Sequence, residues 1–145
     1  MKISFSTLAC PDYSWTDIYS MAKDLGFNGI EVRGLGNEIY SVKAKPFTDA
    51  NIDATVAKLN KLGLEIPCLS SGACLKFADK HDETVEEITQ YAVLAEKLGT
   101  PYIRILADLE PAPVDEIDDN AIIAFLKEIA PIGEKYNVTL LVETN

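Results

Sequence analysis

The chain has 145 residues, of which 48% are hydrophobic and 25% charged, and its formal net charge at pH 7 is −10. This length allows one sizeable hydrophobic core, so we expect a single domain over residues 1–145. The acidic balance argues against nucleic-acid binding, which rests on clustered Lys and Arg side chains.

The N-terminal segment is predicted to be a strand and not a targeting signal. Residues 2–7 alternate apolar and polar side chains, and the apolar run is too short for a secretory signal. No later segment of the sequence is apolar enough to span a membrane. The three cysteines are odd in number and form no CxxC pair, which favours reduced thiols. We therefore expect a cytoplasmic protein without a membrane partner.

The first helix is predicted to begin at Ser14, because Ser14 and Asp17 have the spacing of a capping box. Its apolar stripe faces one side, as in a helix packed against a core. The helix should end at Gly26, since glycine most easily takes the left-handed conformation that closes a helix.

The remaining elements repeat this alternation of strand and helix. Strands are predicted over residues 29–33, 65–70, 102–107 and 138–145, and helices over about 49–62, 84–98 and 120–136. Thr84 and Glu87 form a second capping box. Pro67 suits a sheet edge or a bulge, whereas Pro131 lies inside the last helix and should kink or break it. The fold class is therefore α/β, with about five parallel strands and four helices.

A repeat of 36 to 38 residues underlies this order. Leu-Gly junctions recur at Gly26, Gly63 and Gly99, and Asn137 replaces the glycine in the fourth copy. Each junction closes an amphipathic stretch and opens an apolar run, so the unit is a strand followed by a helix. Connections after helices are short, whereas those after strands are long. In parallel α/β folds the long loops at the C-terminal ends of strands carry the functional site.

Charged side chains stand on one side of three predicted strands. The period of two sends the apolar residues to the helix side and leaves Glu31, Arg33, Arg104 and Glu143 on the other. A sheet covered by helices on both faces should be apolar on both sides, so the pattern favours a barrel with a polar interior floor. We expect a structural ion pair between Glu31 and Arg104, with Glu143 and Arg104 as the alternative pair. Glu143 lies near its strand's end, which favours a role in the site.

Three further patterns are interpreted as structural. His81, the single histidine, is expected to be a solvated side chain just before a helix start. The acidic run over residues 108–119 lacks the spacing and the glycine of a calcium-binding loop and is interpreted as solvated. Gly34 and Gly36 lack the third glycine and the immediate helix of a dinucleotide-binding loop.

Three segments resemble one protein family. Residues 26–33 (GFNGIEVR) resemble the GFDGIEL signature of the xylose isomerase-like barrels, the group of sugar isomerases and sugar-phosphate epimerases. Residues 98–104 (LGTPYIR) resemble the segment LGAPYVRV, and residues 141–145 (LVETN) resemble the strand-five segment IEN. The resemblance covers the whole chain but reaches only the first half of the family's eight-unit barrel. It implies an incomplete half of a TIM (β/α)8 barrel.

The resemblance also implies a chemistry and a set of site residues. In the family the strand-five glutamate ligates a divalent metal (Mn, Mg or Zn) and in the epimerases also moves a proton, and this role falls on Glu143. The other ligands come from later strands, so we expect no metal in this chain alone. The substrate would be a small sugar or sugar phosphate, converted by proton transfer through an enediolate. Ser71, Gly72, Arg33 and Arg104 are the expected substrate-binding residues.

Two functions remain open. The first is the N-terminal half of a metal-dependent sugar isomerase or epimerase, inactive as an isolated chain because one carboxylate cannot hold a divalent ion. The second is a binding or assembly module, either a half-barrel that pairs with a second copy through exposed strand edges or a flavodoxin-like open sheet. The apurinic-endonuclease branch of the superfamily is disfavoured, since it binds zinc through histidines on strands three and four, which are absent here.

Overall fold

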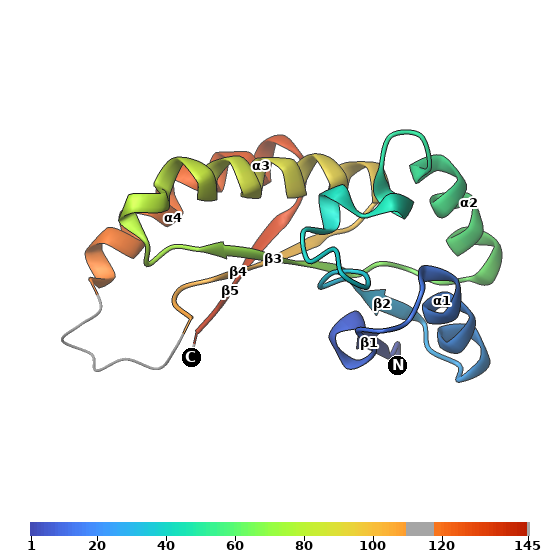
Figure 1. Ribbon diagram of the computed structural model, residues 1–145. Helices are drawn as coiled ribbons and strands as arrows, with labels where there is room; N and C mark the ends of the chain where they lie inside the picture. Colours follow the sequence, from blue (N-terminus) through green and yellow to red (C-terminus); the bar gives the residue numbers. More distant parts are fainter. Residues whose placement is uncertain (110–117, 145) are drawn as a thin grey trace.

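The computed structural model of the protein describes residues 1–109 and 118–144. Strands and helices alternate along this part of the chain (Figure 1). The elements are β1 (Ser4–Ser6), α1 (Trp15–Asp24), β2 (Gly29–Glu31), α2 (Ile52–Leu62), β3 (Cys68–Cys74), α3 (His81–Leu98), β4 (Tyr102–Leu106), α4 (Asp119–Lys135) and β5 (Thr139–Glu143). The five strands and four helices predicted from the sequence are therefore confirmed.

The strands run parallel in the order β1, β2, β3, β4, β5. Hydrogen-bonded ladders join β1 to β2 and β3 to β4 to β5, and the bridges Gly29 to Glu65 and Val32 to Leu69 connect the two ladders. Among the described residues nothing pairs with the outer edges of β1 and β5, so the sheet does not close. A flavodoxin-like sheet has the order 2-1-3-4-5, and that alternative is wrong.

The repeated Leu-Gly junctions are helix ends. Gly63 and Gly99 follow α2 and α3 with φ of 68°, and Gly26 follows α1 with φ of 77°. Asn137, in the fourth copy, is the one described residue other than glycine with positive φ, at 53°. Asparagine tolerates this conformation better than other side chains do, which explains how it replaces glycine in the repeat.

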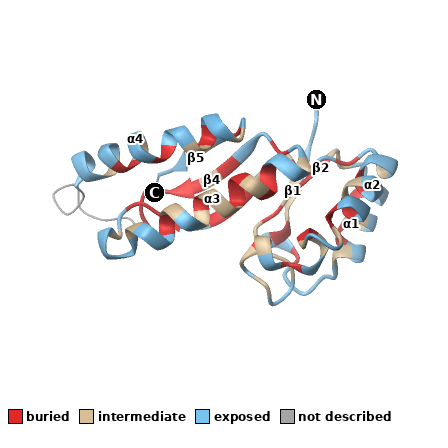
Figure 2. Ribbon diagram, turned by 90° about the horizontal axis from the view of Figure 1, so that it is seen from above, coloured by how far each residue is buried: buried red, intermediate tan, exposed pale blue. Residues whose placement is uncertain are grey.

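The helices cover one face of the sheet. Figure 1 shows α3 and α4 together on one side of β3, β4 and β5, and Figure 2 shows buried residues in β4 and along α3. The strand side chains beneath the helices are completely buried, namely Ile30, Val32, Leu69, Ile103 and Ile105. The facing predicted from the period of two is therefore confirmed on the helix side for residues 29–33 and for β4, whereas Val142 in β5 is 38% exposed.

Several element boundaries differ from the sequence prediction, and the start of α3 and the end of β3 are two of them. The third helix begins at His81 and not at Thr84, because a 3-10 turn over Ala78–Lys80 runs straight into it and leaves Thr84 buried inside the first turns. The second capping box is therefore wrong, whereas the first is present, with Ser14 and Asp17 each accepting from the other's backbone N–H at 3.2 Å. Strand β3 also continues to Cys74, four residues past the predicted end.

Pro131 does not break the last helix. α4 runs unbroken from Asp119 to Lys135 with Pro131 inside it. Pro131 and Lys127, whose carbonyl loses its hydrogen bond, both lie on the exposed side, where water can satisfy that carbonyl. The opposite side packs inward through Phe125 and Ile129. Tertiary packing therefore keeps the helix continuous across the proline.

Candidate functional site

Polar side chains from four strands lie on the face of the sheet that the helices leave open. Glu31 ends β2, Ser70 lies in β3, and Arg104 lies in β4 directly opposite Ser70 in the register. Glu143 is the last residue of β5. Glu31 and Glu143 lie at the C-terminal ends of their parallel strands, where α/β folds place their functional groups, whereas Ser70 and Arg104 lie within theirs.

Glu31 pairs with Ser70 and not with Arg104. The Ser70 hydroxyl donates to the Glu31 carboxylate, and no ion pair between Glu31 and Arg104 occurs within the described residues. The expected Glu31 to Arg104 pair is therefore wrong. The reason is topological, since β3 lies between β2 and β4 and neighbouring strands are separated by about 4.8 Å. Glu31 meets a β3 side chain before it can reach β4.

Arg104 forms the alternative pair, with Glu143. Its Nε lies 3.2 Å from Glu143 Oε2, and its Nη1 donates to the Ser71 carbonyl at 2.9 Å. The Arg104 side chain is 16% exposed, whereas that of Glu143 is 50% exposed. The guanidinium is therefore well buried and doubly anchored, and the carboxylate that it contacts remains open to solvent.

The polar groups of Ser71 and Gly72 form hydrogen bonds within the fold. Ser71 is fully buried, and its hydroxyl donates to the Arg104 carbonyl at 2.8 Å. The Gly72 N–H donates to Glu87 Oε1 on α3 at 2.7 Å. The structure thus brings Ser71, Arg104 and Glu143 together, while Gly72 is tied toward α3.

Arg33 lies two residues after β2 and stands apart from this group. Its backbone N–H donates to Thr7 Oγ1 at 2.9 Å, and its side chain is partly buried. In the described part of the chain its guanidinium forms no ion pair. It is close enough to Tyr91 to oppose the rise in that phenol's pKa caused mainly by burial.

The long loop after β2 is fixed against α3. The Tyr40 hydroxyl donates to Gln90 Oε1 at 2.7 Å, and the Ser41 N–H donates to the Tyr91 hydroxyl oxygen at 3.1 Å. Burial, with a smaller contribution from Glu87, raises the pKa of Tyr40 to about 12. Tyr40 therefore stays protonated at neutral pH and serves as a hydrogen-bond donor that anchors the loop.

Asp108 and His81 differ from what the sequence suggested. Asp108, interpreted as part of a solvated acidic run, is buried, with 5% exposure, two residues after β4. The rest of that run, residues 110–117, lies outside the described residues. His81 begins α3, stacks on Phe125 with 4.5 Å between ring centroids, and contacts Asp82 and Glu128 at 3.0 Å. It therefore joins α3 to α4.

The described residues do not fit a divalent ion on their own. No group of three or more His, Cys, Asp or Glu side chains in residues 1–109 and 118–144 could hold a metal. Glu143 offers one carboxylate, and a stable site needs several oxygen or nitrogen ligands. Cys68 is not a strong ligand candidate either, because burial, reinforced by the charge of Glu31, raises the pKa of its thiol.

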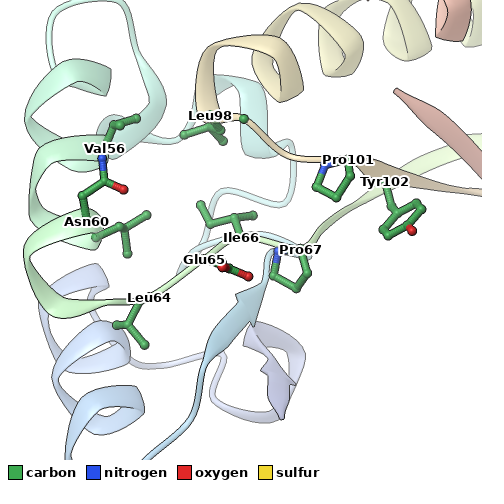
Figure 3. Close-up of a pocket in the computed structure, with 11 residues that line it drawn as sticks. Val56, Asn60, Leu64, Glu65, Ile66, Pro67, Leu98, Pro101 and Tyr102 are labelled. Carbon is green, nitrogen blue, oxygen red and sulfur yellow. The ribbon is translucent and has the colours of Figure 1, made fainter. Parts of the chain in front are cut away.

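An apolar groove lies at the opposite end of the strands. It encloses about 510 Å³ between α2, the end of α3 and the segments that lead into β3 and β4 (Figure 3). Leu64, Ile66, Pro67, Pro101 and Tyr102 are among its lining residues. Because these residues precede or begin their strands, the groove is at the N-terminal end of the sheet and separate from the polar group around Glu143.

The family model described as "Xylose isomerase-like TIM barrel" matches residues 19–145. Three solved structures share the fold. They are the IolI protein with a zinc atom (TM-score 0.78, 18% identity), a probable 3-DHS dehydratase from Bacillus anthracis (0.79, 23%) and a 3-keto-D-glucoside 4-epimerase from E. coli (0.72, 16%). The alignments cover 98 to 99% of this chain and 51 to 55% of those chains.

The chain thus spans about half the length of the solved structures that it matches, and its open sheet corresponds to half of a TIM barrel. No match to a curated protein was found. No helix in the described residues has the length and apolarity that a membrane span requires.

Proposed function

Because the chain belongs to the xylose isomerase-like TIM barrel family, we propose that it is the N-terminal half of a divalent-metal-dependent sugar or sugar-phosphate isomerase or epimerase. The observation that carries this proposal is the position of Glu143. It ends β5, on the open face and at the C-terminal end of the sheet, with its carboxylate half exposed beside Arg104. The fold relatives include a sugar epimerase and a protein crystallised with zinc.

The proposed reaction is proton transfer beside a carbonyl, through an enediolate. Glu143 is the group that we assign to proton transfer and to one ligand position of the ion, because a carboxylate can fill both roles. Arg33, Ser71, Gly72 and Arg104 are proposed to border the substrate. Arg33 suits an anionic group such as a sugar phosphate, since its guanidinium has no ion-pair partner within the described residues.

The remaining metal ligands are assigned to polypeptide outside this chain, because the described residues do not fit the ion alone. We therefore propose that the isolated 145-residue chain is inactive. We also propose a cytoplasmic location, which agrees with three free cysteines, Cys10, Cys68 and Cys74.

The test is a ketose epimerisation and aldose-ketose isomerisation assay with Mn²⁺, Mg²⁺ or Zn²⁺. We expect no turnover by the 145-residue chain, and metal-dependent turnover by a longer product of its gene. Glu143→Gln should lower the kcat of that product by about 10³-fold, since proton transfer by a positioned carboxylate contributes 10² to 10⁴. Turnover by the 145-residue chain would disprove the proposed inactivity, and an unimpaired Glu143→Gln product would disprove the role of Glu143.

A second candidate function is supported by the open strand β5. Its outer edge pairs with nothing in the described residues, and Leu141 and Val142, on opposite faces, are 41% and 38% exposed. Exposed edges of this kind recruit further strands. We propose as the alternative a non-catalytic half-barrel that pairs with a second copy of itself. Light scattering measures the mass of the chain in solution and decides this case. A monomer that also unfolds cooperatively would exclude the half-barrel dimer.

A further inference from the structure

The strand β3 contains an irregularity next to Arg104. Ser70 pairs with Arg104, and the next register pair is Cys74 with Leu106. β3 therefore advances four residues while β4 advances two. A bulge of this kind turns backbone groups away from the ladder and towards other partners. Here the turned groups belong to Ser71 and Gly72.

Ser71 holds Arg104 at both ends of the arginine. Its hydroxyl donates to the Arg104 backbone carbonyl at 2.8 Å, and its carbonyl accepts from Arg104 Nη1 at 2.9 Å. The neighbouring Gly72 N–H is held in turn by Glu87 Oε1 of α3 at 2.7 Å. A continuous series of contacts thus runs from α3 through β3 to the guanidinium on β4.

The last contact in this series is the ion pair with Glu143. An exposed ion pair usually contributes little to stability, because two long side chains must be ordered at once. Arg104 is already ordered by Ser71 and is 16% exposed, so only Glu143 remains to be ordered. The contact is an ion pair, with Glu143 Oε2 3.2 Å from Arg104 Nε.

We propose that Arg104 is a positioning residue for Glu143. The β3 bulge holds Arg104 in place, and Arg104 in turn keeps the Glu143 carboxylate in one orientation at the end of β5. The inference rests on the proposed function, because a carboxylate that ligates an ion or moves a proton must be held within about 0.5 Å of its productive position. Arg104 acts on the reaction through Glu143, and the bulge residues act through Arg104.

The test is NMR relaxation of the Glu143 side chain in the 145-residue chain. The variants are Arg104→Met, which keeps the length of the side chain and removes its donors, and Arg104→Lys, which keeps the charge. Arg33→Met is the matched control, since it removes a charge beside β2 without a contact to Glu143. In the native chain we expect an order parameter of about 0.8 for Glu143, falling below about 0.6 in Arg104→Met. Arg104→Lys should restore part of the order, and Arg33→Met should leave it unchanged.

A folded Arg104→Met chain in which Glu143 keeps its native order would overturn the proposal. Should that variant fail to fold, Glu143→Gln decides instead, because a half-exposed side chain tolerates the substitution. Exchange of the Arg104 Nε–H with water should then become about tenfold faster, the factor that corresponds to about 1.4 kcal/mol. Unchanged exchange would overturn the proposal.

Both readouts are independent of metal and sugar. A longer gene product without epimerase or isomerase activity would disprove the proposed function and leave the positioning of Glu143 standing. A disordered Glu143 in a chain whose longer product is active would disprove the positioning alone.

Discussion

The two faces of the sheet are built from the same strands but serve different purposes. On the helix side Ile103 and Ile105 are completely buried, whereas Arg104, between them in sequence, reaches the open side and contacts Glu143. The helix side contributes apolar burial, which drives folding, and the open side contributes polar contacts of small net energy. A substitution should therefore affect stability on one face and the proposed site on the other.

The largest expected effect is on the helix side. Ile103→Ala should lower the free energy of unfolding by about 2–5 kcal/mol, because it leaves a cavity beneath the helices. Glu143→Gln, on the open face, should change it by less than about 1 kcal/mol. Urea unfolding measures both. The comparison between the faces fails if Glu143→Gln costs as much as Ile103→Ala.

The next effect concerns the contact between α4 and β5. A Cβ atom at Gly133 would lie 2.8 Å from the Val138 carbonyl oxygen, so backbone would have to move. Gly133→Ala should destabilise the chain by about 1–3 kcal/mol in the same urea measurement. Ala130→Ser, on the exposed side of the helix, is the control and should stay within about 0.5 kcal/mol of the native chain. Equal stabilities of both variants would contradict the close packing.

A smaller effect is expected at the bulge. Ser71→Ala removes the hydrogen bond to the Arg104 carbonyl and should cost about 1 kcal/mol, the usual net value of such a bond. Ser20→Ala, at an exposed position of α1, serves as the control and should not differ from the native chain. If Ser71→Ala is as stable as the control, the Ser71 hydroxyl contributes nothing to the anchoring of Arg104.

The smallest effect lies outside both faces, at His81. Asp82 first and then Glu128 raise the pKa of this imidazole in the folded chain above its usual value of 6.5. The protonated form therefore stabilises the fold fully below pH 6.5, and this contribution disappears as the pH rises through the raised pKa. Thermal unfolding of the native chain and of His81→Gln should differ more at pH 5.5 than at pH 8.5. A constant difference across this range would show that the carboxylates do not act on His81.

The sequence predicted the order of the elements because each rests on a local pattern. The capping pair Ser14 and Asp17, the glycines that end the helices and the period of two in the strands are all readable within a few residues. Thr84 shows the limit of such patterns. It has the spacing of a cap, but the preceding 3-10 turn starts the helix earlier, and that turn leaves no clear signal in the sequence.

The candidate site was predicted only in part, because local patterns give the facing of a side chain but not its partner. The facing of Glu31, Arg104 and Glu143 follows from the period of two, but their partners depend on which strands are neighbours. The expected pair between Glu31 and Arg104 ignored that β3 separates their strands, so Ser70 was missed. The bulge at Ser71 and Gly72 also escaped prediction, although two serines followed by a glycine inside a strand can signal an irregular ladder.

The sequential order of the strands has a consequence for how the chain folds. In the described residues each strand pairs only with the strand that precedes or follows it in the chain, so no contact in the sheet has to wait for a more distant segment. Paired strands are one strand-helix unit apart, so each pairing closes a loop of a single unit. Each strand and helix can therefore dock on the preceding units as it leaves the ribosome.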